Sequence, residues 1–413
     1  MSSRIDPRID AFDVAKVRQD FPIFANDVAY LDSANTSQRP RQVTDAMLDY
    51  FQNYNSNILR AAYKFSEQAT GAFEEARRKL KAFVNARSAK EIVYTRGTTE
   101  GLNLVAYSWG RKNVRAGDLL VATVMEHHSN LVPWQVLAQE TGARLEFVDI
   151  DDDGRLRLDQ FHALLEQGPK LVAFNHISNT LGTINPIKEL TAAAKAAGAV
   201  VVVDGAQGAP HLGVDVQDVG CDFYAFSGHK MCGPTGIGVL YGRRELLQDM
   251  PPFMTGGEMI NSVSLEKTTY ADLPHKFEGG TQAIAEAIGL GAAVDYLGGI
   301  GFGPMRVHED TLTEYAHESL SELPGVRIFG PPPGADRSGV LSFDVEGIHP
   351  HDIATILDRH DVYVRSGQNC TEPLMTRLGV SATVRASLYL YSTQRDVDRL
   401  VEAVRDAQRI FRV

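Results

Sequence analysis

A lysine directly follows an apolar strand in the segment Ser227-Gly-His-Lys230. Lysine side chains are mostly exposed, so a lysine in this place requires an explanation. Its amine can form a Schiff base with an aldehyde cofactor. A carboxylate, Asp204, ends the preceding apolar run, and Gln207 follows three residues later. An aspartate at a strand end is often only a cap, but one beside such a lysine can pair with a protonated pyridine nitrogen, so the pattern predicts a pyridoxal-5′-phosphate (PLP) site.

A second segment has the features of a phosphate site. Arg96-Gly-Thr-Thr-Glu100 follows a strand and opens a helix. Free backbone N–H groups and hydroxyls at the start of a helix bind phosphate. Taken alone, Gly-Thr-Thr is more often a plain helix cap. Its order along the chain relative to Asp204 and Lys230 favours the phosphate interpretation.

The histidines of Glu126-His127-His128 follow another strand end. A lone histidine is more often a core or surface residue than a functional one. At this end of a sheet, however, an imidazole could stack on a planar ring or relay protons. A metal site is not expected, because no H-x-E or C-x-x-C spacing accompanies the pair.

The chain has three cysteines, Cys221, Cys232 and Cys370, too few and too scattered for a disulfide framework or a zinc site. Free cysteine is commonly a small buried residue. Cys370, however, lies in the polar, loop-like run Ser366–Pro373, which argues against burial. It is therefore a candidate nucleophile, whereas Cys221 and Cys232 have apolar or Gly/Pro neighbours and are interpreted as structural.

Short runs rich in Val and Ile alternate with amphipathic stretches along the middle of the chain. The predicted strands are Glu91–Thr95, Leu119–Val124, Leu145–Val148, Leu171–Asn175, Val200–Asp204, Phe223–Ser227 and Gly236–Tyr241. The predicted helices between them include Thr99–Trp109, Asn130–Thr141 and Ile187–Ala197. This alternation predicts an α/β fold with a mostly parallel seven-stranded sheet covered by helices on both faces. Ligands in such folds lie beyond the carboxyl ends of the strands, where the polar residues above are found.

The pattern changes near Gly289–Gly303, which predicts a second, smaller α/β domain. We expect residues 25–290 to form a large cofactor domain, and residues 1–24 with 291–413 to form a small domain that contains the Cys370 loop. Elements predicted for the small domain are an N-terminal helix Val14–Asp20, a strand Gly339–Val345, a helix Pro350–His360, a strand Val362–Ser366 and a final helix Gln394–Arg412.

Composition narrows the function classes further. The 413 residues are 44% hydrophobic and 23% charged, with a formal net charge of −11. An acidic chain repels nucleic acid and anionic membranes, so neither is expected as a main partner. The first residues lack an apolar core of the signal-peptide type, and no apolar run has the length of a membrane span. We therefore expect a cytoplasmic protein.

Together, these motifs resemble the class V, fold-type I PLP enzymes. More narrowly, the chain resembles the type II (SufS-like) cysteine desulfurases, a group that includes selenocysteine lyases. The matching segments are Tyr30–Pro40, Arg96–Gly101, Met125–His128, Asn130–Trp134, Ser178–Asn179, Asp204–Gln207, Ser227–Lys230, Arg365–Cys370 and Arg385–Ser387. The likeness extends over almost the whole chain and implies the fold-type I architecture.

The resemblance implies roles for the residues around the cofactor ring. Lys230 would attach PLP covalently and later move protons. Asp204 would face the pyridine nitrogen, and Gln207 the phenolic oxygen. His127 would stack on the ring, and Asn179 would also contact the cofactor.

The phosphate would be bound, by the same resemblance, by Thr99, Ser227 and His229, and Thr98 would also contact the cofactor. Thr281 would reach the phosphate from a second subunit, so a homodimer is implied.

The substrate and the nucleophile are also implied by the resemblance. Asn179, Arg365 and Arg385 would bind the substrate carboxylate, which the planar guanidinium of arginine binds as a fork. Cys370 would attack the sulfur of L-cysteine, or the selenium of L-selenocysteine. The reaction would give L-alanine and a persulfide on Cys370. A sulfur acceptor protein would then receive the sulfur for iron–sulfur cluster assembly or thiolation.

The chain departs from the family pattern at three places around the site. Gln368 and Asn369 replace two histidines before the cysteine, the segment Leu59–Tyr63 retains only the arginine of a His-Arg-Gly-x-His motif, and Gly279–Gln282 replaces Ala-Gly-Thr-Pro. Another PLP reaction is therefore an alternative: selenocysteine lyase, C–S β-lyase, epimerase or aminotransferase. A non-catalytic scaffold is a third reading, which the intact Lys230 and Arg385 argue against.

Overall fold

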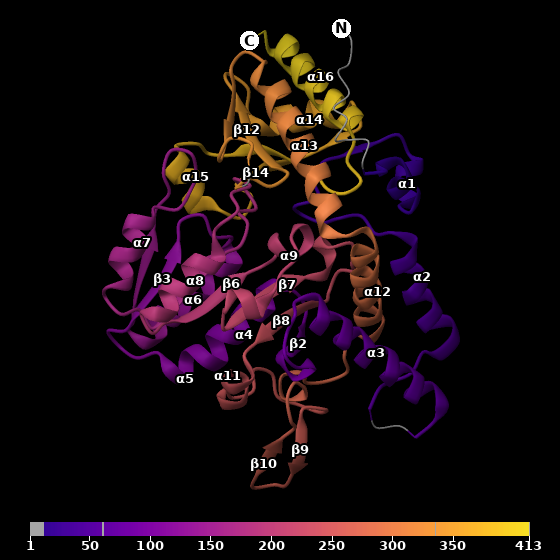
Figure 1. Cartoon of the computed structure of the whole chain (residues 1–413), viewed down its shortest axis with the longest axis vertical. Helices are drawn as coiled ribbons and strands as arrows, with labels where there is room; N and C mark the ends of the chain where they lie inside the picture. The colour runs from indigo at the N-terminus through magenta and orange to yellow at the C-terminus, as the bar shows by residue number, and fades with distance from the viewer. Residues whose placement is uncertain (1–11, 60–61, 335, 413) are drawn as a thin grey trace.

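The computed structural model describes residues 12–59, 62–334 and 336–412 (Figure 1). Its largest sheet has seven strands in the order β2-β8-β7-β6-β5-β3-β4. These strands are β2 (Ile92–Thr95), β8 (Gly238–Gly242), β7 (Phe223–Ser227), β6 (Val200–Asp204), β5 (Leu171–Asn175), β3 (Leu119–Thr123) and β4 (Arg144–Val148). Only β8 runs against its neighbours, because it follows β7 through a short connection rather than a helical crossover. The predicted, mostly parallel seven-stranded sheet is thus confirmed.

Alternating side chains of these strands enter two separate cores. Val172 and Phe174 of β5 pack in one buried cluster, and Leu171 and Ala173 pack in the other. Both faces of the strand are therefore buried, which explains why the sequence shows continuous apolar runs rather than alternation.

Helices cover both faces of the large sheet (Figure 1). One face is covered by α4 (Thr98–Leu104), which continues through a π turn (Val105–Gly110) into α5 (Arg111–Asn113), and by α6 (Val132–Thr141). The other face is covered by α3 (Lys64–Phe83), α8 (Ile187–Ala196) and α12 (Ile284–Ile300), with α2 (Arg41–Asp49) beside α12. The chain before residue 250 also forms α1 (Val14–Gln19), α7 (Leu158–Leu165), α9 (Gly208–His211), α10 (Val216–Val219) and α11 (Arg244–Asp249).

A smaller antiparallel sheet lies at the top of Figure 1. Its order is β11 (Val326–Phe329), β12 (Val340–Val345), β15 (Thr383–Ser387) and β14 (Arg365–Gly367). It has its own buried cluster, to which Leu312, Phe343 and Leu400 belong. The helices of this part are α13 (Phe302–Ser321), α14 (Pro350–Asp358), α15 (Glu372–Leu378) and α16 (Gln394–Phe411).

Three details differ from the sequence prediction. The single predicted strand Val362–Ser366 is divided: β13 (Val362–Tyr363) pairs in parallel with β1 (Ala29–Tyr30), whereas β14 pairs with β15. Strands β11 and β15 were not predicted, and neither was the projecting hairpin of β9 (Ile260–Val263) and β10 (Thr268–Tyr270). The hairpin strands are largely exposed, the apolar side chains of the short strand β11 are interrupted by Arg327, and β15 has an arginine at its centre.

No single helix of the described residues is long and apolar enough to cross a membrane. Helices α12 and α13 together meet the criteria of length and composition but bend by 76° at their junction. Most of α12 packs in the core beneath the large sheet.

An ion pair is buried beneath the large sheet. Both Arg77 and Glu278 have side chains only 1% exposed, and the guanidinium Nη1 and Nη2 donate to the two carboxylate oxygens at 2.6 and 2.9 Å. The backbone N–H of Tyr94 also donates to Glu278. Burial alone would raise the pKa of Glu278, but the adjacent Arg77 holds it at about 2. The pair fixes the segment that leads to Thr281 against α3 and β2.

Glu278→Gln should therefore lower the free energy of unfolding by about 3 kcal/mol, because it removes the fully buried counter-charge of Arg77 and leaves only the partly exposed Glu74. Urea unfolding followed by circular dichroism would measure this. Glu75→Gln is the matched control, since Glu75 pairs with Arg78 on the exposed side of the same helix. Equal unfolding midpoints for the two variants would contradict the prediction.

Candidate active site

A cavity of about 170 Å³ opens at the carboxyl ends of the strands of the large sheet. Nine of the predicted site residues line it: Thr98, Thr99, His127, Asn179, Asp204, Gln207, Ser227, His229 and Lys230. They come from segments that follow β2, β3, β5, β6 and β7, or from the ends of these strands. Parallel strands with a common direction thus bring residues more than 100 positions apart to one edge, as the sequence pattern predicts.

Lys230 and Asp204 provide the cavity with one cation and one anion. Lys230 ends a short 3-10 turn directly after β7, and Asp204 ends β6 with only 5% of its surface exposed. Burial lowers the pKa of the Lys230 amine, which the Asp204 carboxylate opposes. Burial likewise raises the pKa of Asp204, which the N–H of Ala206 at 2.9 Å and the charge of Lys230 oppose. A lowered amine pKa increases the fraction of neutral, nucleophilic lysine at neutral pH.

Gln207 has a buried polar atom without a partner. Its Nε2 donates to the carbonyl of Ala34 at 2.6 Å, while its Oε1 has no hydrogen bond among the described residues. Buried amide oxygens are nearly always satisfied, so this atom points to a polar group of a ligand in the cavity. An amide oxygen accepts hydrogen bonds, so it needs a donor, which PLP offers as its phenolic hydroxyl, and the polar groups around the cavity fit this cofactor.

The segment Arg96–Glu100 has the hydrogen-bond donors that a phosphate site requires. The hydroxyl of Ser227 accepts from the backbone N–H of Thr98 at 2.8 Å and lies 2.8 Å from the Thr98 hydroxyl. Thr99 is hydrogen-bonded to the hydroxyl of Ser129 at 2.7 Å. Gly97 has φ of +153°, and a side chain there would approach the Ser227 oxygen to 3.1 Å. Glycine thus allows the loop to place its hydroxyls and N–H groups around one point, as an anion requires.

His127 is held as a neutral imidazole. Its Nδ1 accepts from the backbone N–H of Ser129 at 3.0 Å, so the proton of the neutral ring lies on Nε2. Burial and the nearby Lys230 charge lower its pKa to about 3. His229 behaves similarly, with a pKa lowered to about 4 by burial and by Lys230. At neutral pH both rings can stack or donate a hydrogen bond without adding positive charge.

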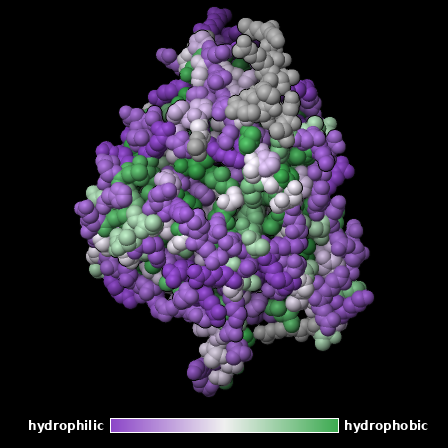
Figure 2. Space-filling model, in the orientation of Figure 1, coloured by the Kyte–Doolittle hydropathy of each residue, from purple (hydrophilic) through white to green (hydrophobic). Residues whose placement is uncertain are grey.

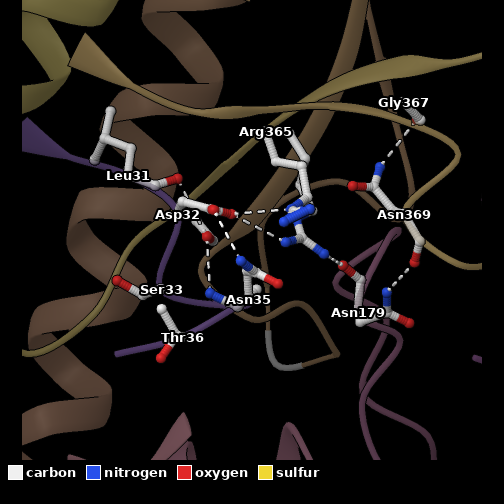
Figure 3. A network of polar contacts seen from close by, with 12 residues as sticks. Leu31, Asp32, Ser33, Asn35, Thr36, Asn179, Arg365, Gly367 and Asn369 are labelled. Carbon is white, nitrogen blue, oxygen red and sulfur yellow. Dashed lines mark hydrogen bonds and ion pairs between the residues drawn. The ribbon is translucent and has the colours of Figure 1, made fainter. Parts of the chain in front are cut away.

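A network of charged groups borders the cavity on the side of the smaller sheet (Figure 3). Arg385 is 2% exposed, and its Nη1 donates to the Asn179 carbonyl at 2.9 Å. Its Nη2 donates to the Asp32 carboxylate at 3.2 Å, and Arg365 Nε lies 3.7 Å from the same oxygen. The Nε atoms of both arginines are buried and make no hydrogen bond among the described residues. Arg365 and Arg385 are register partners on β14 and β15, which explains their proximity.

The Cys370 loop is attached to this network at two backbone carbonyls. The Asn179 amide donates to the Asn369 carbonyl at 2.8 Å, and the N–H of His128 donates to the Cys370 carbonyl at 2.8 Å. Asn369 and Cys370 have φ of +53° and +57°, a left-handed conformation that asparagine tolerates well. The Cys370 side chain is exposed, and a negative charge on its sulfur would raise the pKa of Lys230. The expected exposure of Cys370 is thus confirmed, and Cys221 and Cys232 are buried.

Thr281 is the one predicted cofactor residue that does not line this cavity. It is exposed and lines a separate cavity of about 350 Å³ with Arg96 and Met254. Of the segment Leu59–Tyr63, Arg60 and Ala61 lie outside the described residues.

Several residues of the site had no role predicted from the sequence, and three of them are polar or charged groups with clear contacts. Asn175 and Ser129 line the cavity, and Asp32 joins the arginine network. Asn175 ends an apolar strand just as Asp204 does, so the same pattern could have identified it. Asp32 follows a strand of only two residues, for which the sequence gives no comparable signal.

The comparisons with known proteins agree with this geometry. Residues 29–400 match the family described as Aminotransferase class-V, and the chain belongs to that family. A probable cysteine desulfurase from Synechocystis sp. is 49% identical over 403 residues, 96% of each chain. A cysteine desulfurase from Haloferax volcanii is 46% identical over 417 residues, 97% of this chain and 98% of that protein. Within the class-V family, the chain belongs to the cysteine desulfurases.

Solved structures give the same result. The apo cysteine desulfurase from Thermococcus onnurineus is 42% identical, with a TM-score of 0.92 over 95% of this chain and 97% of that one. A cysteine desulfurase from Escherichia coli in its S-sulfonic acid form has a TM-score of 0.91 and 39% identity over 97% of this chain and 99% of that one. A cystine C–S lyase at 23% identity and a TM-score of 0.80 shares the fold alone.

Proposed function

We propose that this protein is a PLP-dependent cysteine desulfurase that converts L-cysteine to L-alanine and forms a persulfide on Cys370. The observation that supports this most directly is the attachment of the Cys370 loop to the cofactor cavity. Asn179 lines that cavity and also binds the Asn369 carbonyl, so the exposed thiol follows a residue bound directly to the wall of the cavity. A reaction that passes an atom from a substrate to a protein thiol needs this arrangement.

The cofactor would be held by residues that already surround the cavity. We assign the covalent attachment of PLP to Lys230 and the stacking on its ring to His127. Asp204 would bind the pyridine nitrogen, and Gln207 would bind the phenolic oxygen. PLP supplies an electron sink for the negative charge that develops at the substrate Cα. The buried Asp204 carboxylate would maintain the positive charge of the ring nitrogen on which that sink depends.

Phosphate binding is assigned to Thr98, Thr99, Ser227 and His229. The hydroxyls of Thr98 and Ser227 lie 2.8 Å apart at the start of a helix, where free N–H groups add to the donor set.

The chain's own groups would then move the proton and the sulfur. The Lys230 amine removes the proton from the substrate Cα. The Cys370 thiolate attacks the substrate sulfur, so that a sulfur–sulfur bond forms and the carbon–sulfur bond breaks. The electron pair of the broken bond remains on Cβ, which is protonated to give the methyl group, and the Lys230 ammonium returns a proton to Cα to complete L-alanine. Arg385, Arg365 and Asn179 would hold the substrate carboxylate during these steps.

We also propose a homodimer in which Thr281 binds the phosphate of the partner subunit. This proposal is supported by the exposure of Thr281 and by its place in a cavity other than the cofactor cavity of its own subunit. Figure 2 shows apolar patches that interrupt the mostly hydrophilic surface across the middle of the view, as a subunit interface requires. We further propose that residues 25–290 form a large domain, and that residues 1–24 and 291–413 form a small domain.

The sulfur would pass from Cys370 to an acceptor protein for iron–sulfur cluster assembly or thiolation. L-selenocysteine is the alternative substrate. We place the protein in the cytoplasm, a compartment that suits its free cysteines.

The decisive experiment incubates the purified holoenzyme with L-cysteine and follows alanine, sulfide and pyruvate together. Before reductant is added, intact mass and peptide mapping locate any added sulfur. Equal amounts of alanine and sulfide, with one extra sulfur on the Cys370 peptide, are expected. Pyruvate, or an unmodified Cys370, would instead indicate a β-lyase or another class-V reaction.

The residues before Cys370 permit a further prediction. Gln368 is exposed, whereas Asn369 is buried and donates to Thr383 Oγ1 at 3.1 Å. Gln368→His should raise turnover of L-cysteine several-fold, because a titrating imidazole beside the thiol can exchange protons that glutamine cannot. Asn369→His should add nothing, since it removes the bond to Thr383. Steady-state kcat measures both effects, and an unchanged rate in Gln368→His would mean that proton exchange at Cys370 does not limit turnover.

A further inference from the structure

His128 contacts the Cys370 loop with both its backbone and its side chain. Its backbone N–H donates to the Cys370 carbonyl at 2.8 Å. Its imidazole Nε2 accepts from the backbone N–H of Glu372 at 3.1 Å. The two contacts lie on either side of Thr371, so one residue binds the chain both at the nucleophile and at the start of α15. The proposed reaction gives this imidazole no role.

These contacts restrain a strained stretch of backbone. Asn369 and Cys370 are both in the left-handed region, with φ of +53° and +57°. This region is unfavourable for a residue with a Cβ, and asparagine tolerates it better than cysteine. Strain of this kind persists only where the surrounding structure enforces it. Asn179 binds the Asn369 carbonyl (Figure 3), and His128 binds the Cys370 carbonyl and the N–H two residues later.

The turn that contains His128 also carries the histidine that faces the cofactor cavity. His127 lines that cavity and directly precedes the 3-10 turn His128–Asn130. The Nδ1 of His127 accepts from the N–H of Ser129 within its own turn, whereas the Nε2 of His128 accepts from the Cys370 loop. Two adjacent residues thus join the wall of the cavity to the loop of the nucleophile.

We propose that His128 is a positioning residue that fixes the Cys370 thiol relative to the bound substrate. Its imidazole would hold the N–H of Glu372, and with it the loop, at the place from which the thiolate reaches the substrate sulfur. This inference rests on the proposed function, in which Cys370 attacks that sulfur. A displacement of about 1 Å is enough to slow a reaction between held groups, so a loosened loop should slow sulfur transfer without weakening substrate binding.

Two amide substitutions separate this contact from the general effects of losing a histidine. Glutamine can place its acceptor oxygen near the position of Nε2, whereas the shorter asparagine reaches only the position of Nδ1. In His128→Asn, the single-turnover rate of persulfide formation on Cys370 should fall at least about tenfold. The concentration of L-cysteine that gives half of the absorbance change of the bound cofactor should stay the same. His128→Gln should retain a rate within about threefold of that of the unmodified protein.

Hydrogen exchange of the backbone amides gives a readout that does not depend on catalysis. The peptide that contains Glu372 should exchange faster in His128→Asn than in His128→Gln, because only asparagine leaves that N–H without its acceptor. His349→Ala is the matched control. His349 is exposed, and its Nδ1 also accepts a backbone N–H at the start of a helix, that of His351 in α14. Its loss should leave persulfide formation unchanged.

An unchanged rate of persulfide formation in His128→Asn would overturn the inference. If asparagine prevents folding, His128→Gln alone decides, because its rate and the protection of its Glu372 amide should be kept or lost together. A change in only one of the two would show that this bond does not position the thiol. Failure of the proposed function is a separate result, since the unmodified protein would then form no persulfide while exchange at Glu372 still reports the contact.

Discussion

Lys230→Ala should lose the covalently bound cofactor and lower turnover of L-cysteine by on the order of 10⁴-fold or more. The reason is that one amine performs two tasks, attaching the cofactor and removing the proton from Cα. Its environment suits both, since burial lowers its pKa and Asp204 lies close enough to interact with it. No other lysine lines the cavity among the described residues, so no neighbouring amine can substitute.

Borohydride reduction followed by peptide mass measurement would give the clearest readout. The unmodified protein should carry the mass of the reduced cofactor on the Lys230 peptide, and Lys230→Ala should carry it nowhere. Lys188→Ala is a suitable control, because Lys188 is an exposed surface residue paired with Asp218. Cofactor fixed to another lysine in the Lys230→Ala protein would refute the assignment.

Cys370→Ser should retain the cofactor and bind L-cysteine but form no persulfide. A serine hydroxyl is not deprotonated near neutral pH and cannot hold sulfur as a stable persulfide, whereas a thiolate can. The loop conformation should survive, because it depends on the backbone carbonyls bound by Asn179 and His128 rather than on the sulfur. Release of alanine should therefore fall to background while the spectral response to added L-cysteine remains.

Cys221→Ala provides the matched removal of a cysteine, since Cys221 is buried in the core cluster of the large sheet. It should cost about 1 kcal/mol of stability and leave persulfide formation intact. Alanine release at the normal rate from Cys370→Ser would exclude Cys370 from the reaction.

The sequence was sufficient to predict the large sheet and most residues at its edge. Apart from the edge strand β4, these strands are buried on both faces, so each appears as an uninterrupted apolar run, and the polar residue after the run marks its end. Asp204 and Lys230 are both found by this rule. The two-domain division and the roles of these residues stay predictions.

The smaller sheet was less predictable for a physical reason. Strand β15 is fully buried but contains Arg385, whose charge interrupts the apolar pattern and is satisfied by Asp32 from a distant part of the chain. Strands β13 and β14 are too short to show the alternation of apolar and polar residues that marks a strand. They are recognised only by the strands with which they pair, β1 and β15. Such elements are defined by tertiary contacts, which local patterns do not record.

The two tethered carbonyls of the Cys370 loop also bear on sulfur delivery. With the Asn369 and Cys370 carbonyls both bound, a persulfide could move only by rotation about its own side-chain bonds, a reach of a few ångströms. The loop cannot then act as a swinging arm that carries sulfur to a distant protein. An acceptor must instead present its thiol on a slender, protruding segment that approaches the mouth of the cavity. In sulfur transfer, the mobile segment would thus belong to the acceptor, and the rigid cysteine loop to this enzyme.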